Sequence, residues 1–203
     1  MMLLFAARHF YPRPRDLDVA PPDLTAGHLP RRFWAYVAAA ALIAAGYADF
    51  PLIAFHFGKT GLIAAVWIPV FYSLAMAADA MAALFLGRLF DRIGIGAMIL
   101  ATCASALSVP LAFLGGPAAA MTGMVLWGIG MGAQASVMRA AIAPLAPASQ
   151  RGTAYGLAWF AGSSLLGVLY DWSVPALAAV SVLLQIAAVA ILWRASNSRG
   201  LKG

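Results

Sequence analysis

Six long apolar stretches are the feature that most constrains the fold of this chain. A membrane-spanning helix needs roughly 20 apolar residues. Of the 203 residues, 64% are hydrophobic and only 10% are charged, which excludes a soluble domain with a single core. The stretches are rich in Ala, Leu and Gly without polar/apolar alternation, so they predict helices rather than barrel strands. The predicted spans are 33–57, 63–90, 96–114, 118–140, 153–169 and 174–193.

These spans divide the chain into three parts. Residues 33–194 form the six-helix transmembrane domain of a predicted all-α membrane protein. Residues 1–32 are rich in proline and arginine, which predicts an extended cytoplasmic leader. Residues 195–203 form a short cytoplasmic tail.

The distribution of positive charge predicts the orientation in the membrane. Six spans would place both termini on one side, together with every lysine and arginine except Lys59. Positive residues stay on the cytoplasmic side, so we expect a multi-pass protein of the plasma (bacterial inner) membrane with both termini cytoplasmic. The net charge of +6 then reflects topology and contact with the lipid bilayer, and it gives no support for nucleic-acid binding.

Enzymatic functions find little support in the composition. The chain contains no glutamate and no histidine after His56, and its one cysteine is Cys103. These residues give no metal-ligand spacing, no Ser/His arrangement for nucleophilic catalysis and no P-loop. We therefore expect no enzyme activity, no cofactor and no metal site.

A short glycine- and arginine-containing turn separates the second and third predicted spans. Its residues are Gly87, Arg88, Leu89, Asp91, Arg92 and Gly94. The pattern Gly-x-Leu-x-Asp-Arg-x-Gly at this place resembles the signature loop of the major facilitator superfamily of secondary transporters. Ile95 and Gly96 stand where the family pattern continues with basic residues, a weakening typical of the copy in the second half. The run 151–156 also looks like the start of the eleventh helix of that family, and the leader looks like its central cytoplasmic loop.

The resemblance implies half of a twelve-helix bundle, in which the substrate binds between two six-helix halves. We expect a half-size secondary active transporter of a small solute, proton-coupled, acting as a homodimer or with a separate N-terminal half. The resemblance also implies that Asp91 contacts a helix end of the opposite half. For Arg88 and Arg92, the alternative is that both are only topology anchors. Gly87 and Gly94 would allow neighbouring helix ends to approach closely. The alternative function is a non-transporting membrane scaffold or relic subunit that only binds a partner.

Two aspartates fall inside predicted spans, where a carboxylate is costly unless it faces protein, water or a proton. Asp79 lies near the centre of the second span and Asp49 lies beyond the centre of the first. Both are candidate proton or cation sites. Asp49 precedes Pro51, so it could instead cap a broken helix; Asp79 could instead be neutral and hydrogen-bonded to a neighbour. We prefer Asp79 as the coupling acid because no proline or helix end explains it.

Polar and aromatic residues at helical spacing predict a substrate cavity. Tyr155, Trp159 and Ser163 recur every four residues in the fifth span, and Trp127 and Gln134 lie seven apart in the fourth. The alternative for both sets is ordinary packing. His56 is a further cavity candidate on the face of Asp49, or else an interfacial residue; a relay between Asp49 and His56 would need water or substrate between them.

Overall fold

The structure is a computed structural model that describes the backbone of residues 31–134 and 148–197 and the side chains of 34–134 and 159–197. The described residues contain helices and no strand, which confirms an all-α protein. The helices are α2 Arg31–Ala45, α3 Phe50–Thr60, the short 3₁₀ helix η2 Ala65–Trp67, α4 Ile68–Ile93, α5 Ile95–Ala106, α6 Ser108–Leu114, α7 Pro117–Ala133, α9 Ala148–Trp172 and α10 Val174–Asn197.

Four segments of the described chain are long and apolar enough to cross a membrane. They are Trp34–Thr60, Ala65–Ile93, Ile95–Leu114 and Val174–Asn197. α7 is a shorter apolar helix that reaches the edge of the described range, and α9 covers the fifth predicted span. The chain is therefore a multi-pass membrane protein, while the number of six spans stays a prediction.

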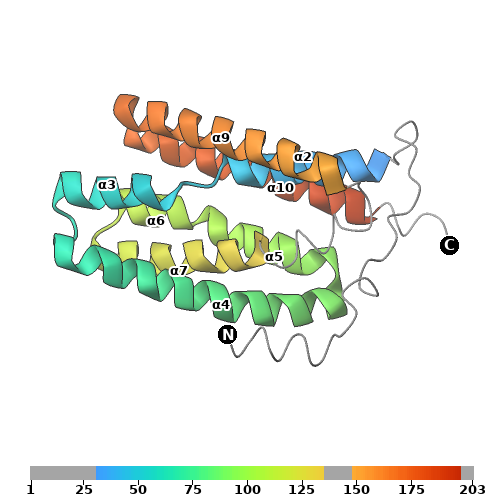
Figure 1. The fold of residues 1–203 in the computed structure, drawn as a ribbon, viewed down its shortest axis with the longest axis horizontal. Coiled ribbons are helices and arrows are strands. Elements are labelled where there is room, and N and C mark those ends of the chain that lie inside the picture. The colour runs from blue at the N-terminus through green and yellow to red at the C-terminus, as the bar shows by residue number, and fades with distance from the viewer. Residues whose placement is uncertain (1–30, 135–147, 198–203) are drawn as a thin grey trace.

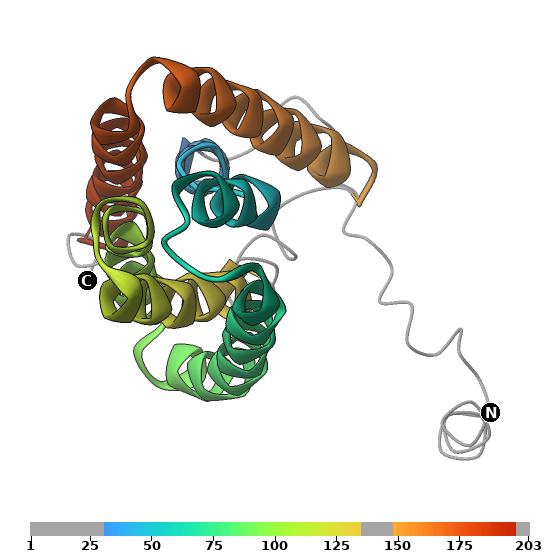
Figure 2. The same ribbon diagram turned by 90° about the vertical axis from the view of Figure 1, so that its left-hand side faces the viewer.

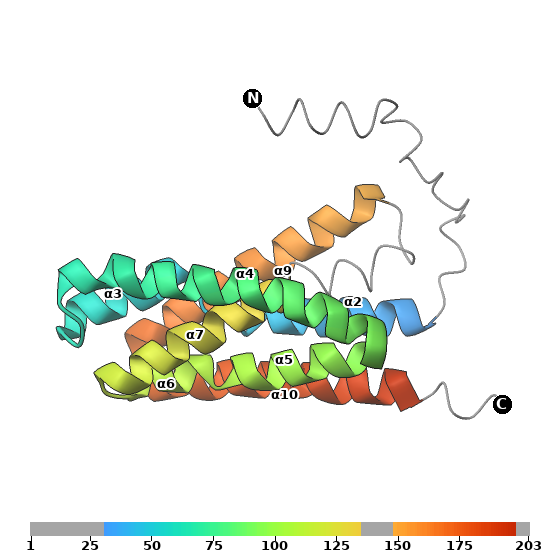
Figure 3. The ribbon, with the colours of Figure 1, turned by 90° about the horizontal axis from the view of Figure 1, so that it is seen from below.

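The first predicted span lies inside the helix bundle. Viewed along the bundle, α2 and α3 run through its centre, with α9 and α10 on one side and α5, α6 and α7 on the other (Figure 2). α2 contacts α9 and α10, and α3 contacts α4 and α6. Most helices follow the long axis of the molecule (Figure 1), whereas α9 is tilted across it (Figure 3). Side chains on α2 and α3 can thus meet partners from several helices.

The same span is broken in its middle, which corrects the expectation of a continuous helix over residues 33–57. α2 ends at Ala45 and α3 begins at Phe50. Pro51 has no N–H and occupies the first turn of α3, so the helix cannot continue through it without losing a hydrogen bond. The third span is interrupted at Leu107, where Pro110 cannot donate to the carbonyl of Ala106 four residues earlier.

The signature residues occupy the end of a helix rather than a loop. α4 continues to Ile93 and α5 begins at Ile95, so Gly94 is the whole turn, with φ of 59°. Glycine adopts this left-handed conformation without the strain that a side chain would add. Gly87, Arg88, Asp91 and Arg92 therefore lie on the last two turns of α4.

The expected close approach at the signature glycines is not found among the described residues. A Cβ built on Gly87 or on Gly94 would meet nothing within 4 Å. Close approach occurs instead between α4 and α7, where a Cβ on Gly132 would come within 2.5 Å of the Asp79 carbonyl oxygen and 2.8 Å of the Ala83 nitrogen. Small residues bring these two helices into backbone contact.

Candidate functional site

The break between α2 and α3 leaves backbone carbonyls without helical partners, and side chains from other helices bind them. Ser181 Oγ, on α10, donates to the Gly46 carbonyl at 2.6 Å, and Gln185 Nε2 lies 3.4 Å from the same oxygen. Trp127 Nε1, on α7, donates to the Ala48 carbonyl at 2.8 Å. An unsatisfied backbone group in a membrane costs several kcal/mol, so these donors stabilise the break.

Asp49 lies at the C-terminal end of this break and is bound to α9. Its Oδ1 accepts a hydrogen bond of 2.8 Å from Trp159 Nε1, and its Oδ2 accepts one from Ser163 Oγ. Asp49 holds the N-cap position of α3, but its side chain makes no capping hydrogen bond. The alternative that Asp49 only caps α3 is therefore wrong, because its carboxylate is engaged by another helix.

A series of aromatic rings leads from Trp159, which binds the carboxylate, toward α4. Tyr47 lies 5.7 Å from Trp127 and 6.0 Å from Trp159, and its hydroxyl donates to the Trp127 carbonyl. Phe50 lies 4.3 Å from Tyr72 of α4. We call these residues the Asp49 cluster: Tyr47, Asp49, Phe50, Tyr72, Trp127 and Trp159.

The Asp49 cluster is closed on one side and open on the other. Tyr47 and Trp127 are buried, at 1% and 4% exposure, whereas Tyr72 is 38% exposed. Asp49, Phe50 and Trp159 have intermediate burial. The Asp49 cluster thus has a buried side at Tyr47 and Trp127 and an accessible side at Tyr72.

Asp79 lies on the side of α4 that packs against α7. It follows Ala75 by four residues and precedes Ala82 by three, and both alanines are buried, so the three share one helical stripe. The side chain itself is half-buried, and no other described residue donates a hydrogen bond to its carboxyl. Gly132 of α7 packs against the Asp79 backbone, and Gly130 of the same helix packs against the ring of Tyr47. Asp79 and the Asp49 cluster therefore belong to the same region of the bundle.

His56 is buried in the core of the bundle, near the C-terminal end of α3. It is 5% exposed, its Nδ1 lies 3.1 Å from the Tyr170 hydroxyl, and its ring is 4.8 Å from that of Phe113. Asp49 and His56 have separate partners on α9, and no hydrogen bond joins them within the described part of the chain. The structure does not bring His56 into the Asp49 cluster.

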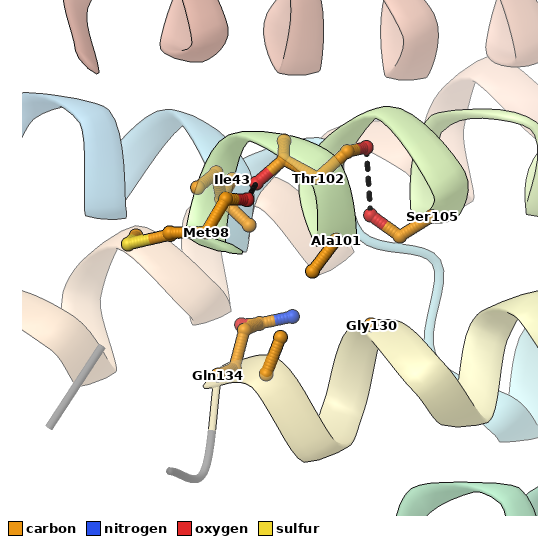
Figure 4. A pocket seen from close by; sticks show the side chains of 8 residues that line it. Ile43, Met98, Ala101, Thr102, Ser105, Gly130 and Gln134 are labelled. Carbon is orange, nitrogen blue, oxygen red and sulfur yellow. Dashed lines mark hydrogen bonds between the residues drawn. The ribbon is translucent and has the colours of Figure 1, made fainter. Parts of the chain in front are cut away.

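Gln134 lines a different space from the one that Trp127 occupies. Its side chain reaches from the end of α7 toward α5 (Figure 4). The cavity there is about 10 Å³, close to the minimum for one water molecule. Its lining residues are Ile43, Met98, Ala101, Thr102, Ser105, Gly130, Ala133 and Gln134. This space is too small for a transported solute.

Comparison with known proteins identifies the family. The profile of the Major Facilitator Superfamily matches residues 1–170. This chain belongs to the major facilitator superfamily. It is 32% identical over 206 residues to uncharacterised proteins of Mycobacterium bovis and of two Mycobacterium tuberculosis strains. The match covers 95% of this chain and 50% of each relative, so the chain spans about half the length of these curated relatives. No solved structure matches it significantly.

Sequence reasoning found part of this facilitator's site and missed the rest. It singled out Asp49, Trp127, Trp159 and Ser163, which the structure brings together at the break; the side chain of Tyr155 lies outside those that the structure describes. It missed the residues of α10 that bind the Gly46 carbonyl, and it missed Ser105 of α5, which donates to Gln185 Oε1 at 2.7 Å. Ser181 and Gln185 lie four apart in an apolar helix, a polar pair that could have indicated a shared interior face. The missed residues are Tyr47, Ser105, Tyr170, Ser181 and Gln185.

Proposed function

We propose that this facilitator is half of a proton-coupled secondary active transporter of a small solute. The observation that carries the proposal is the Asp49 carboxylate, held at a break in the central span by donors from another helix. Charged residues inside membranes are retained at substrate and ion pathways, and discontinuous helices form the binding sites of several transporter folds. The family consists of transporters, which agrees with this assignment.

The two intramembrane acids have different surroundings, which supports different roles. Two donors fix the Asp49 carboxylate in place, as expected of a group that orients a solute. No other described residue donates a hydrogen bond to the Asp79 carboxyl. A proton can therefore join or leave Asp79 without breaking a described hydrogen bond. Asp79 is thus the coupling acid in this proposal.

The transport pathway would be completed by a second six-helix half. A lipid-facing aspartate at the bilayer centre costs about 2.5 to 3.5 kcal/mol on insertion scales, and the open side of the Asp49 cluster would face lipid without a partner. In this proposal the second half is a further copy of this chain or a six-helix unit of different sequence. Residues 1–32 and 195–203 would lie in the cytoplasm, on the arginine-rich side of the plasma membrane.

The experiment is solute-driven proton movement into proteoliposomes that contain the full chain, followed with a trapped pH-sensitive dye. For solutes that produce a signal, Asp79→Asn should abolish accumulation driven by a pH gradient while leaving the amount of inserted protein unchanged. Asp171→Asn, at an exposed aspartate near the end of α9, is the matched control and should transport normally. Unaltered pH-driven uptake by the Asp79 variant would remove Asp79 from the mechanism, and no flux with any solute would favour the scaffold function.

A further inference from the structure

We propose that the open side of the Asp49 cluster binds an organic cation, an amine or quaternary ammonium that carries apolar groups. The inference rests on the proposed transport function and adds the chemical class of its substrate. It follows from the charge of the cluster, from the occupancy of its carbonyl oxygens, and from its accessible rings.

The Asp49 carboxylate has no positive side chain beside it among the described residues. Both of its partners, Trp159 and Ser163, are neutral donors. The dipole of α3 offsets part of the negative charge of the carboxylate. It does not supply a bound cation that a ligand would have to displace. The described lysine and arginine side chains are all exposed and lie near helix ends: Lys59, Arg88, Arg92 and Arg194. The described part of this site therefore attracts cations and offers an anionic solute no counter-charge.

Most of the oxygens at the break are already occupied, which disfavours a bare metal ion there. Small cations need several oxygen ligands at once. The Gly46 and Ala48 carbonyls already accept bonds from side chains, and the Asp49 carbonyl accepts the N–H groups of Leu52 and Ile53. The described residues contain no group of three His, Cys, Asp or Glu side chains that could hold a metal ion. The favoured cation is therefore one that needs few oxygen ligands.

The aromatic residues supply what an organic cation uses instead. An ammonium group within about 6 Å of a ring face is attracted by the ring's negative face, and its carbon substituents bury apolar surface. Phe50 follows Asp49 directly in the chain and packs against the exposed Tyr72 at 4.3 Å. A cation next to the carboxylate would thus place its apolar groups against Phe50 and Tyr72.

The test uses two probes of matched shape and opposite charge, tetraphenylphosphonium and tetraphenylborate, with the full chain in lipid nanodiscs. Tetraphenylphosphonium should bind saturably above the level of empty nanodiscs. Asp49→Asn should weaken its binding by at least about tenfold, because the carboxylate beside the cation loses its charge. Phe50→Leu should weaken it about threefold to tenfold.

Matched variants separate charge from folding. Ser163→Ala removes one hydrogen bond to the same carboxylate but keeps its charge, so it should weaken binding clearly less than Asp49→Asn. Asp171→Asn should leave binding unchanged. Equal binding by wild type and Asp49→Asn, or competition by tetraphenylborate as strong as by the cation, would overturn the proposal.

The outcome can be separated from that of the proposed function. Binding in nanodiscs requires no flux, so saturable, Asp49-dependent binding without transport in proteoliposomes would retain the cation site and reject the transporter. Proton-coupled flux of a neutral or anionic solute, with no tetraphenylphosphonium binding, would retain the transporter and reject the cation site.

Discussion

Single glycines decide how closely the helices around the site approach. A Cβ on Gly162 of α9 would lie 2.6 Å from the carbonyl oxygen of Ala45, the last residue of α2, whereas a Cβ on Gly167 would meet nothing within 4 Å. Gly162→Ala should therefore lower stability by about 1 to 3 kcal/mol through overpacking. Gly167→Ala should be neutral or stabilising by up to about 1 kcal/mol, since alanine favours helices. Thermal unfolding of the two variants in detergent measures the difference; equal melting temperatures would contradict the contact.

The residue scale also shows what the sequence can predict. The depth of Asp49 and Trp159 in apolar stretches indicated that each needs a partner, because polar groups are costly in lipid. Their pairing depends on the distance and rotation between α3 and α9, which helical periodicity within one span does not contain. Asp79 was found for the same reason as Asp49. Whether it takes up a proton is a property of its chemistry that neither periodicity nor packing determines.

At the scale of elements, two polar contacts join α3 to α9 at matching positions along the two helices. Asp49 meets Ser163, and His56 meets Tyr170, and both pairs are separated by 114 residues in the chain. Each pair lies two turns from the other on its own helix, so α3 and α9 run in parallel and are bound at two depths. The sequence predicted both spans, and Pro51 indicated a possible break in the first one, although not its partners on α9.

We predict that the two polar contacts keep α3 and α9 together when a ligand binds. Spin labels at Gly58→Cys and Gly167→Cys, in a Cys103→Ser background, occupy positions with open space around them. Their distance distribution should stay the same when tetraphenylphosphonium is added, because the two polar contacts persist. A shifted distribution would show that α9 separates from α3. The same two labels in a Tyr170→Phe variant, which lacks the hydroxyl that contacts His56, should give a broader distance distribution.

At the scale of the whole molecule, the proposed partner makes a prediction about mass. If a second copy completes the site, the native mass in mild detergent should be twice the 21.2 kDa of one chain, after subtraction of bound detergent and lipid. Light scattering combined with size-exclusion chromatography measures it. A monodisperse monomer that still transports in a bilayer would contradict any need for a partner half. An inactive monomer would instead favour a separate chain as the partner.

The hydrogen-bonded break between α2 and α3 also affects how the protein folds during synthesis. α2 and α3 precede every helix that supplies a donor to their free carbonyls, and Ser181 and Gln185 come near the end of the chain. During synthesis, α2 and α3 therefore enter the membrane with polar backbone atoms whose donors, on α7 and α10, are made only later. The break between α2 and α3 thus reaches its final form only after both of those helices have been inserted.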